Sequence, residues 1–269
     1  MSAAQKAFPF YFRLSDKPLF GCYHEPAPGR LRPCGVLICQ PVGHEYVNSH
    51  RALRQLAVRL AEAGFPVLRF DYYGCGDSSG STEDVSIRQG LEDTSAAISE
   101  LRRRTGLFQV CVVGLRLGGT LAALAALDRG DIESMVLWDP VVDGRRYLDE
   151  LSSLQKEMLR FRPKQRHNQK ANPQIEILGF SFSHWFISEL ENINLMTTAR
   201  KVTRNLLVMQ SSPWINDNSS DDHLSLSTTQ HEYQRLDAPE IWLPTADGSL
   251  LVPAQVLQAI VAWNCGIHS

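Results

Sequence analysis

Short apolar runs alternate with longer amphipathic segments along most of the 269-residue chain. The amphipathic segments place apolar residues at helical spacing, and the apolar runs are too short for helices and rich in Val, Ile and Leu. We predict parallel strands at 34–39, 66–70, 110–113, 134–138, 206–209 and 240–243, and helices at 49–63, 87–103, 120–127 and 253–263. This alternation is typical of a mostly parallel sheet covered by helices on both faces.

Two departures from this alternation add detail to the predicted α/β fold. Segments 8–14 and 19–24 flank the turn Ser15-Asp16-Lys17-Pro18, which predicts an N-terminal antiparallel hairpin. About sixty residues, 144–204, separate two predicted strands, more than a simple crossover needs. We predict an insertion there, with a helix at 147–161 and a second apolar helical stripe beginning at 180–186. The organisation expected is one domain over 1–269.

A glycine-rich turn joins the third parallel strand to its helix. The segment Gly114-Leu115-Arg116-Leu117-Gly118-Gly119 resembles the G-x-S-x-G nucleophile elbow, in which glycines allow the chain to cross over tightly and expose the central side chain. Arg116 stands where that motif has serine. A guanidinium stays protonated at working pH, so it supplies charge and hydrogen-bond donors but no nucleophile.

Three further motifs surround the turn in a specific order. Residues 71–78 match a D-x-x-G-x-G-x-S loop, 36–45 resemble a strand and oxyanion loop, and 135–142 resemble the next core strand. Over about 9–264 the chain resembles the α/β-hydrolase superfamily, specifically the serine aminopeptidase-like hydrolases and the bacterial hydrolases of exosortase and biosynthetic clusters. The resemblance implies that the insertion at 144–204 is a cap over the pocket; the alternative is a helical excursion that covers the sheet edge.

The resemblance also implies positions for the other site residues. Backbone amides of Val42, Gly43, His44 and Leu117 would form the oxyanion or ligand-binding loop. The acid would be Asp139, with Asp217 as a second candidate. The histidine should follow the last strand, where the chain has Asp247 instead and no histidine before His268. A carboxylate is a poor base for a hydroxyl, so the Ser-His-Asp mechanism is not expected.

Arg116 admits two interpretations. It could form a structural ion pair with Asp139 or Asp247, because an unpaired buried arginine is costly. It could instead bind a carboxylate or phosphate, aided by the N-terminus of the next helix. A displaced nucleophile is a weaker hypothesis: Cys75 would need His44 or His50 within reach. His223 follows two aspartates, and we interpret these as a helix cap rather than a metal site.

Composition excludes several classes of function. A net charge of −2 gives no basic field for nucleic acid, and no apolar stretch reaches the length of a membrane span. Six scattered cysteines form no C-x-x-C pair, and Cys39 and Cys111 fall in predicted core strands, so neither disulfides nor zinc are expected. We expect a cytoplasmic protein without cofactor or metal. Its macromolecular partner could be a protein of the same pathway or a second copy of the chain.

Two functions fit these observations. The first is a hydrolase-like or acyl-transferring protein that handles an acyl ester, thioester or amide by a rearranged mechanism, with Asp139 as base. The second is a non-catalytic relative that binds an anionic ligand or a partner from a biosynthetic pathway. The sequence leaves both open.

Overall fold

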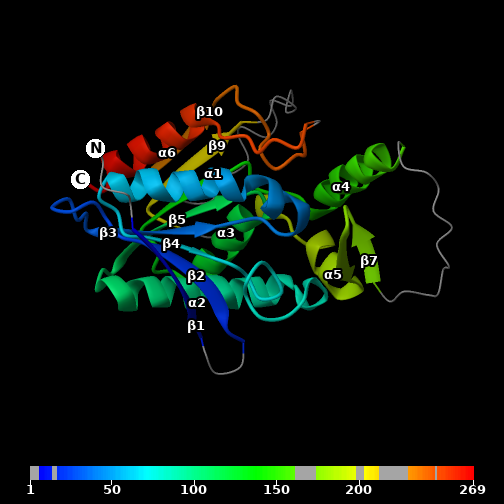
Figure 1. Ribbon diagram of the computed structural model, residues 1–269, viewed down its shortest axis with the longest axis horizontal. Helices are drawn as coiled ribbons and strands as arrows, with labels where there is room; N and C mark the ends of the chain where they lie inside the picture. The colour runs from blue at the N-terminus through cyan, green and yellow to red at the C-terminus, as the bar shows by residue number, and fades with distance from the viewer. Residues whose placement is uncertain (1–5, 14–16, 161–173, 198–202, 212–229, 246) are drawn as a thin grey trace.

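Eight strands form one sheet in the order β1-β2-β4-β3-β5-β6-β9-β10 (Figure 1). The computed structural model describes residues 6–13, 17–160, 174–197, 203–211, 230–245 and 247–269. The strands are β1 (Ala7–Phe12), β2 (Leu19–His24), β3 (Cys34–Cys39), β4 (Val67–Phe70), β5 (Gln109–Leu115), β6 (Ser134–Trp138), β9 (Asn205–Gln210) and β10 (Gln230–Arg235).

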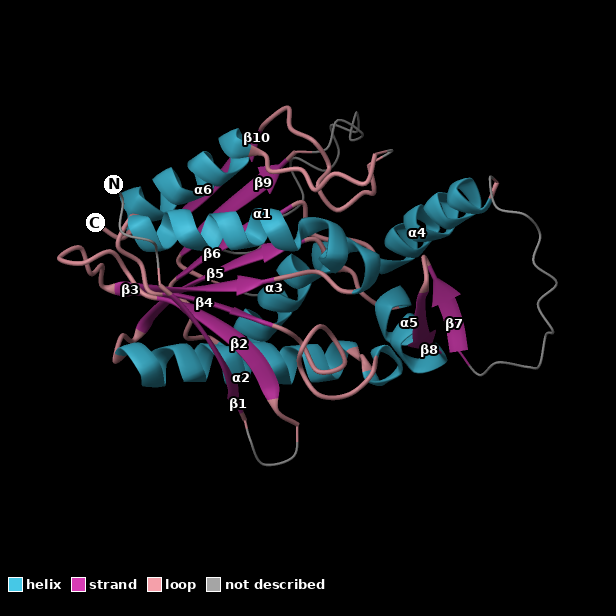
Figure 2. Ribbon diagram, in the orientation of Figure 1, coloured by secondary structure: helices cyan, strands magenta, loops and turns pink. Residues whose placement is uncertain are grey.

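The predicted fold class is confirmed. β1 and β2 form the antiparallel hairpin, β2 also pairs with β4 in antiparallel register, and the pairs from β4 to β10 are parallel. Helices cover both faces, as Figure 2 shows. They are α1 (Gly43–Glu62) and α6 (Ala254–Ile267) on one face, and α2 (Ile87–Thr105) and α3 (Leu117–Arg129) on the other.

Alternation of side chains along the strands explains the two helical layers. Val36 and Ile38 of β3 pack in a core cluster with α1 and α6, whereas Leu37 and Cys39 pack in a second cluster with α2 and α3. Successive strand residues point to opposite faces, so a strand covered on both sides must be apolar throughout. All six residues of β3 are buried, including Cys39, and Cys111 of β5 is buried as well.

The described part of the chain between β6 and β9 lies beyond the carboxyl ends of the central strands (Figure 1). It holds α4 (Gly144–Leu159), the antiparallel pair β7 (Gln174–Ile177) and β8 (Phe180–Ser183), α5 (His184–Glu191) and the short helix η2 (Leu195–Thr197). The helix predicted at 147–161 corresponds to α4. The second predicted helical stripe was wrong at its start, because 180–183 is a strand and the helix begins at His184.

The strand predicted at 240–243 was also wrong. That segment is a turn whose Ile241 and Trp242 are buried in the core beside α6. The last strand is instead β10, whose sequence Gln-His-Glu-Tyr-Gln-Arg is polar. β10 pairs with one neighbour at the sheet edge and is mostly exposed, so it lacks the apolar signal of a covered strand. Apolar residues at 241–242 reflect packing rather than strand pairing.

Buried His24, at the end of β2, gives the fold a predicted pH dependence. Its side chain is 1 % exposed, and its Nε2 accepts a hydrogen bond from Arg69 Nε at 3.3 Å. Burial, followed by the charge of Arg69, lowers the pKa of His24 to about 4. In the unfolded chain His24 is protonated below about pH 6.5, whereas in the folded chain it stays neutral until about pH 4. The free energy of unfolding therefore falls as pH drops below about 6.5.

We expect His24→Gln to flatten this dependence. Between about pH 7 and about pH 5 the wild-type free energy of unfolding should fall about 2 kcal/mol more than that of the variant, measured by urea denaturation. His231→Gln, at an exposed position on β10, is the control and should leave the slope unchanged. Parallel pH profiles for wild type and His24→Gln would show that His24 does not titrate as described.

Candidate functional site

The turn between β5 and α3 lies at the carboxyl edge of the sheet. Its glycines are required by close backbone approaches. A Cβ on Gly118 would lie 2.4 Å from the carbonyl oxygen of Cys39, and a Cβ on Gly114 would lie 2.4 Å from the Cα of Gly119. The turn is thus pressed between its own helix and the end of β3. This contact brings the end of β3 beside Arg116.

Arg116 adopts a backbone conformation that non-glycine residues rarely occupy. Its φ is 51° and its ψ is −126°, and its amide donates to the carbonyl oxygen of Trp138 at 3.0 Å. Such a conformation costs on the order of 1–3 kcal/mol and persists only where the surrounding structure enforces it. The conformation aims the side chain away from the sheet and into a pocket.

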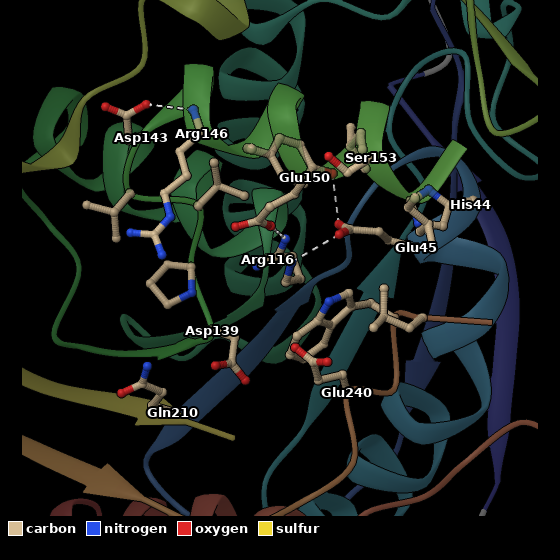
Figure 3. A pocket seen from close by; sticks show the side chains of 18 of the residues that line it. His44, Glu45, Arg116, Asp139, Asp143, Arg146, Glu150, Ser153, Gln210 and Glu240 are labelled. Carbon is tan, nitrogen blue, oxygen red and sulfur yellow. Dashed lines mark hydrogen bonds and ion pairs between the residues drawn. The ribbon is translucent and has the colours of Figure 1, made fainter. Parts of the chain in front are cut away.

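The guanidinium of Arg116 is held by two carboxylates and two aromatic rings (Figure 3). Its Nε donates to Glu45 Oε1 at 3.0 Å, and its Nη2 donates to Glu150 Oε2 at 2.7 Å. The rings of Tyr147 and Trp242 lie 5.2 and 4.9 Å from its central carbon. The side chain is only 12 % exposed. We call these five residues the Arg116 cluster.

Glu45 is the buried member of the cluster. It lies in the first turn of α1, where a carboxylate also compensates the positive end of the helix dipole. Its second oxygen accepts a hydrogen bond from Tyr147 Oη at 2.9 Å. Burial raises the pKa of Glu45, and the adjacent guanidinium of Arg116 opposes that rise. The attraction of Glu45 in turn keeps the pKa of Arg116 well above its ordinary value. Both helix α1 and helix α4 are thereby tied to the turn.

The ion pair expected for Arg116 forms with different partners. The sequence suggested Asp139 or Asp247, but the structure pairs Arg116 with Glu45 and Glu150. Asp139 does line the same pocket at the end of β6, with a φ of 43°. Its carboxylate accepts hydrogen bonds from the backbone amide of Ser211, at 3.1 Å, and from the hydroxyl of that residue.

Asp247 is not brought to the pocket. It is exposed, and its carboxylate accepts the amide of Ser249 at 3.0 Å within its own turn. Hydrogen bonds from Ser249 lower its pKa. The residues that enter the pocket after β10 are Glu240, Trp242 and Leu243. We expected the pocket residue after a strand at 240–243, whereas the last described strand is β10, which ends at Arg235. The expected position was therefore several residues too far along the chain.

The predicted oxyanion residues lie at two helix N-termini. Gly43 and Leu117 are the first residues of α1 and α3, and Val42 is the residue before α1. His44 lines the pocket beside Arg116, in the first turn of α1 rather than in a loop. Burial and the charge of Arg116 lower the pKa of His44 to about 4, so its ring is neutral at physiological pH.

Cys75 does not have the surroundings of a reactive thiol. It is not among the residues that line the pocket, and burial raises its pKa to about 12. His50 is exposed and its ring bonds the carbonyl oxygen of Val47 at 2.8 Å. No hydrogen bond joins Cys75 to either histidine within the part of the chain that the structure describes. Asp217 and His223 lie outside the described residues.

One serine–histidine contact is present elsewhere in the molecule. The hydroxyl of Ser134 lies 2.7 Å from Nε2 of His268, and both residues are buried. Ser134 is the first residue of β6, so this contact is at the amino edge of the sheet, whereas the pocket is at the carboxyl edge. The contact fixes the C-terminal residues to the sheet and has no access to the pocket.

The pocket itself has a volume of about 660 Å³, within the range of small-molecule sites. Its apolar walls come from β9, α4 and the chain after β10. Within the described part of the chain, its acidic lining residues are Glu45, Asp139, Asp143, Glu150, Glu157 and Glu240, and its basic ones are Arg116 and Arg146. Among the described residues no group of three His, Cys, Asp or Glu could hold a metal ion. None of the described helices is long and apolar enough to cross a membrane.

Comparison of the chain with protein families identifies a matching family. The sequence profile described as serine aminopeptidase, S33, matches residues 41–226, which include the turn, the Arg116 cluster apart from Trp242, and Asp139. No curated protein sequence matches the chain.

Solved structures with the α/β-hydrolase fold resemble the chain over nearly its whole length. Est1E from Butyrivibrio proteoclasticus, solved with ferulic acid bound, has a TM-score of 0.67 at 16 % identity and covers 94 % of this chain and 97 % of its own. A Pyrococcus furiosus esterase has a TM-score of 0.67 at 14 % identity, covering 98 % and 92 %. A Xanthomonas campestris serine hydrolase without a lid has a TM-score of 0.60 at 14 % identity, covering 98 % and 95 %. These likenesses confirm the fold.

Removing the guanidinium should destabilise the protein through Glu45. We expect Arg116→Met to lower the free energy of unfolding at neutral pH by about 3 kcal/mol, because it leaves a buried carboxylate without its cation. The loss is present above the folded-state pKa of Glu45. It should shrink as pH falls through the folded-state pKa, and it should be lost below the ordinary glutamate pKa of about 4.3, where the carboxylate is protonated in both states. Denaturant titrations at several pH values measure this.

Two further variants isolate the buried pair. Adding Glu45→Gln to Arg116→Met should recover most of the lost stability, since the uncompensated charge is gone. Arg204→Met is the matched surface control, because Arg204 is 67 % exposed in its ion pair with Glu133, and it should cost under about 1 kcal/mol. Equal losses for Arg116→Met and Arg204→Met would contradict the structural importance of the cluster.

Proposed function

Because the chain belongs to the serine aminopeptidase S33 family, we propose that it is a ligand-binding member that does not hydrolyse by the serine mechanism. In this proposal Arg116 stands at the position of the nucleophile. One observation carries the proposal: the side chain at the tight turn after β5 is a guanidinium, and it is hydrogen-bonded to the carboxylates of Glu45 and Glu150. A protonated guanidinium cannot attack a carbonyl, and its two ion pairs hold it in the position that another nucleophile would need.

A base for hydroxyl activation is also lacking in the expected place. Residues 236–253, between the last strand and the last helix, contain no histidine. Glu240 enters the pocket from that segment instead, and a carboxylate has far too low an ordinary pKa to activate a serine. His44 lines the pocket, but its ring forms no hydrogen bond with a described serine. Loss of both nucleophile and base supports the absence of serine-type hydrolysis.

The displaced nucleophile and the rearranged acyl mechanism find less support. Cys75 is away from the pocket with a raised pKa. Asp139, the candidate base, already accepts hydrogen bonds from the amide and the hydroxyl of Ser211. A cavity of about 660 Å³ with both apolar and charged lining residues nonetheless remains, and a binding protein needs such a cavity.

We further propose that the segment over 144–204 acts as a cap on this pocket. Tyr147 and Glu150 of α4 contact Arg116, and residues of α4 line one wall. A cytoplasmic location, a bacterial biosynthetic setting and a pathway partner or homodimer stay predictions from the sequence.

The test is an ester and thioester panel with matched variants. We expect wild type to turn over p-nitrophenyl esters and acyl thioesters no faster than Arg116→Ala, and no serine to react with a fluorophosphonate probe. Arg116→Ser should not restore turnover, because no histidine activates the new hydroxyl. Cys75→Ala and Asp139→Ala identify the origin of any activity. Turnover lost in either variant, or a labelled serine, would refute the proposal.

A further inference from the structure

Helix α4 is anchored unevenly along its length. Its start is pressed against α5, where a Cβ on Gly144 would overlap the carbonyl oxygen of Leu190. Tyr147, in the first turn, is buried and hydrogen-bonded to α1. Of residues 150–159, which we call the outer half of α4, only Leu151 is buried. Local unfolding costs least where few apolar contacts are buried, so the outer half should unfold more readily than the start of the helix.

The outer half of α4 is also a wall of the pocket. Its pocket-lining residues are Glu150, Leu151, Ser153, Leu154 and Glu157. Figure 1 shows α4 running outward beyond the carboxyl ends of the central strands. A short helical end depends on packing for its stability, and it frays in water when that packing is lost. Loss of the contacts that dock the outer half would therefore open the pocket on this side.

Glu150 and Gln155 attach the outer half to the rest of the molecule. Glu150 Oε2 accepts a hydrogen bond from Arg116 Nη2 at 2.7 Å, and Gln155 Oε1 accepts one from the backbone amide of Leu178 at 2.9 Å. The side chain of Glu150 is 49 % exposed, whereas that of Glu45, the other carboxylate on Arg116, is 1 % exposed. Dissolved salt therefore screens the pair with Glu150 much more than the pair with Glu45.

From these contacts we infer that the Arg116–Glu150 ion pair is a latch, which holds the outer half of α4 closed over the pocket. Glu45 keeps the guanidinium in place and repels Glu150 across it, so the outer pair can break while the buried pair stays intact. When the outer pair breaks, the outer half frays and a ligand can enter or leave. The inference rests on the proposed cap and gives Arg116 a role in controlling access.

Hydrogen exchange followed by mass spectrometry tests the latch. We expect amide exchange in the outer half of wild-type α4 to become about threefold to tenfold faster between low salt and about 0.5 M salt. Glu150→Gln should exchange at the faster rate in both conditions, because the ion pair is gone. Peptides from α5 are the internal reference and should not change. Equal exchange of α4 in wild type and Glu150→Gln would overturn the inference.

Charge reversal at the same position gives a sharper result. Glu150→Lys places a second cation beside Arg116, so its outer half should exchange fastest at low salt, and added salt should slow it by screening the repulsion. A general effect of salt on the helix cannot produce opposite slopes. Glu157→Gln is the matched control, since Glu157 is exposed on the same helix and lines the same pocket. Salt effects of the same sign in wild type and Glu150→Lys, or exchange in Glu157→Gln as fast as in Glu150→Gln, would contradict the latch.

An introduced thiol tests whether fraying opens the pocket to a small molecule. Val208 of β9 lines the pocket and is 6 % exposed, so in Val208→Cys the alkylation rate with N-ethylmaleimide, read by peptide mass, reports access. We expect Glu150→Gln to raise this rate about threefold or more, in parallel with the exchange of α4. An unchanged rate would refute the opening.

These measurements require neither a ligand nor turnover. Ester hydrolysis by wild type would refute the proposed function and leave the latch standing. Unaltered exchange of α4 in the Glu150 variants would refute the latch and leave the proposed function standing.

Discussion

A single buried ion pair, between Arg116 and Glu45, constrains the whole candidate site. The guanidinium sits above the turn from β5 into α3, and the carboxylate comes from the first turn of α1. Neither charge is tolerable alone at these depths, where removing one partner costs about 3–5 kcal/mol. The pair therefore fixes two helices and the turn relative to one another. Tyr147 binds Glu45 and Glu150 binds Arg116, so the ion pair also holds α4 in place.

This arrangement changes what the pocket can do. A turn that exposes one side chain at the end of a central strand is suited to catalysis, because the side chain stands free in the cavity. Here that side chain forms ion pairs with Glu45 and Glu150, while its backbone keeps the positive φ of 51°. The proposed ligand-binding role follows from this. The cavity remains, and the guanidinium that reaches it from the turn is paired with Glu45 and Glu150.

Much of the core could be predicted because covered strands have a distinctive sequence. Runs such as 34–39 are apolar on both faces, and the glycines at 114 and 118 mark a turn that no Cβ would fit. The polar edge strand β10 could not be predicted, since exposure on both faces leaves no periodic signal. That error carried over to the site: it placed Asp247 near the pocket and overlooked Glu240. The apolar character of Trp242 correctly predicted that it is buried, but it wrongly suggested a strand where the chain forms a turn.

The sequence alone determined that a guanidinium, not a hydroxyl, occupies the turn after β5, and that no histidine lies between β10 and α6. Both are properties of residue identity and need no coordinates. Tertiary structure alone decided which carboxylates meet that guanidinium. Glu45 and Glu150 are 71 and 34 residues away along the chain, and they come from helices whose approach depends on packing rather than on local pattern. An arginine needs some counter-ion when buried, but only the fold selects it.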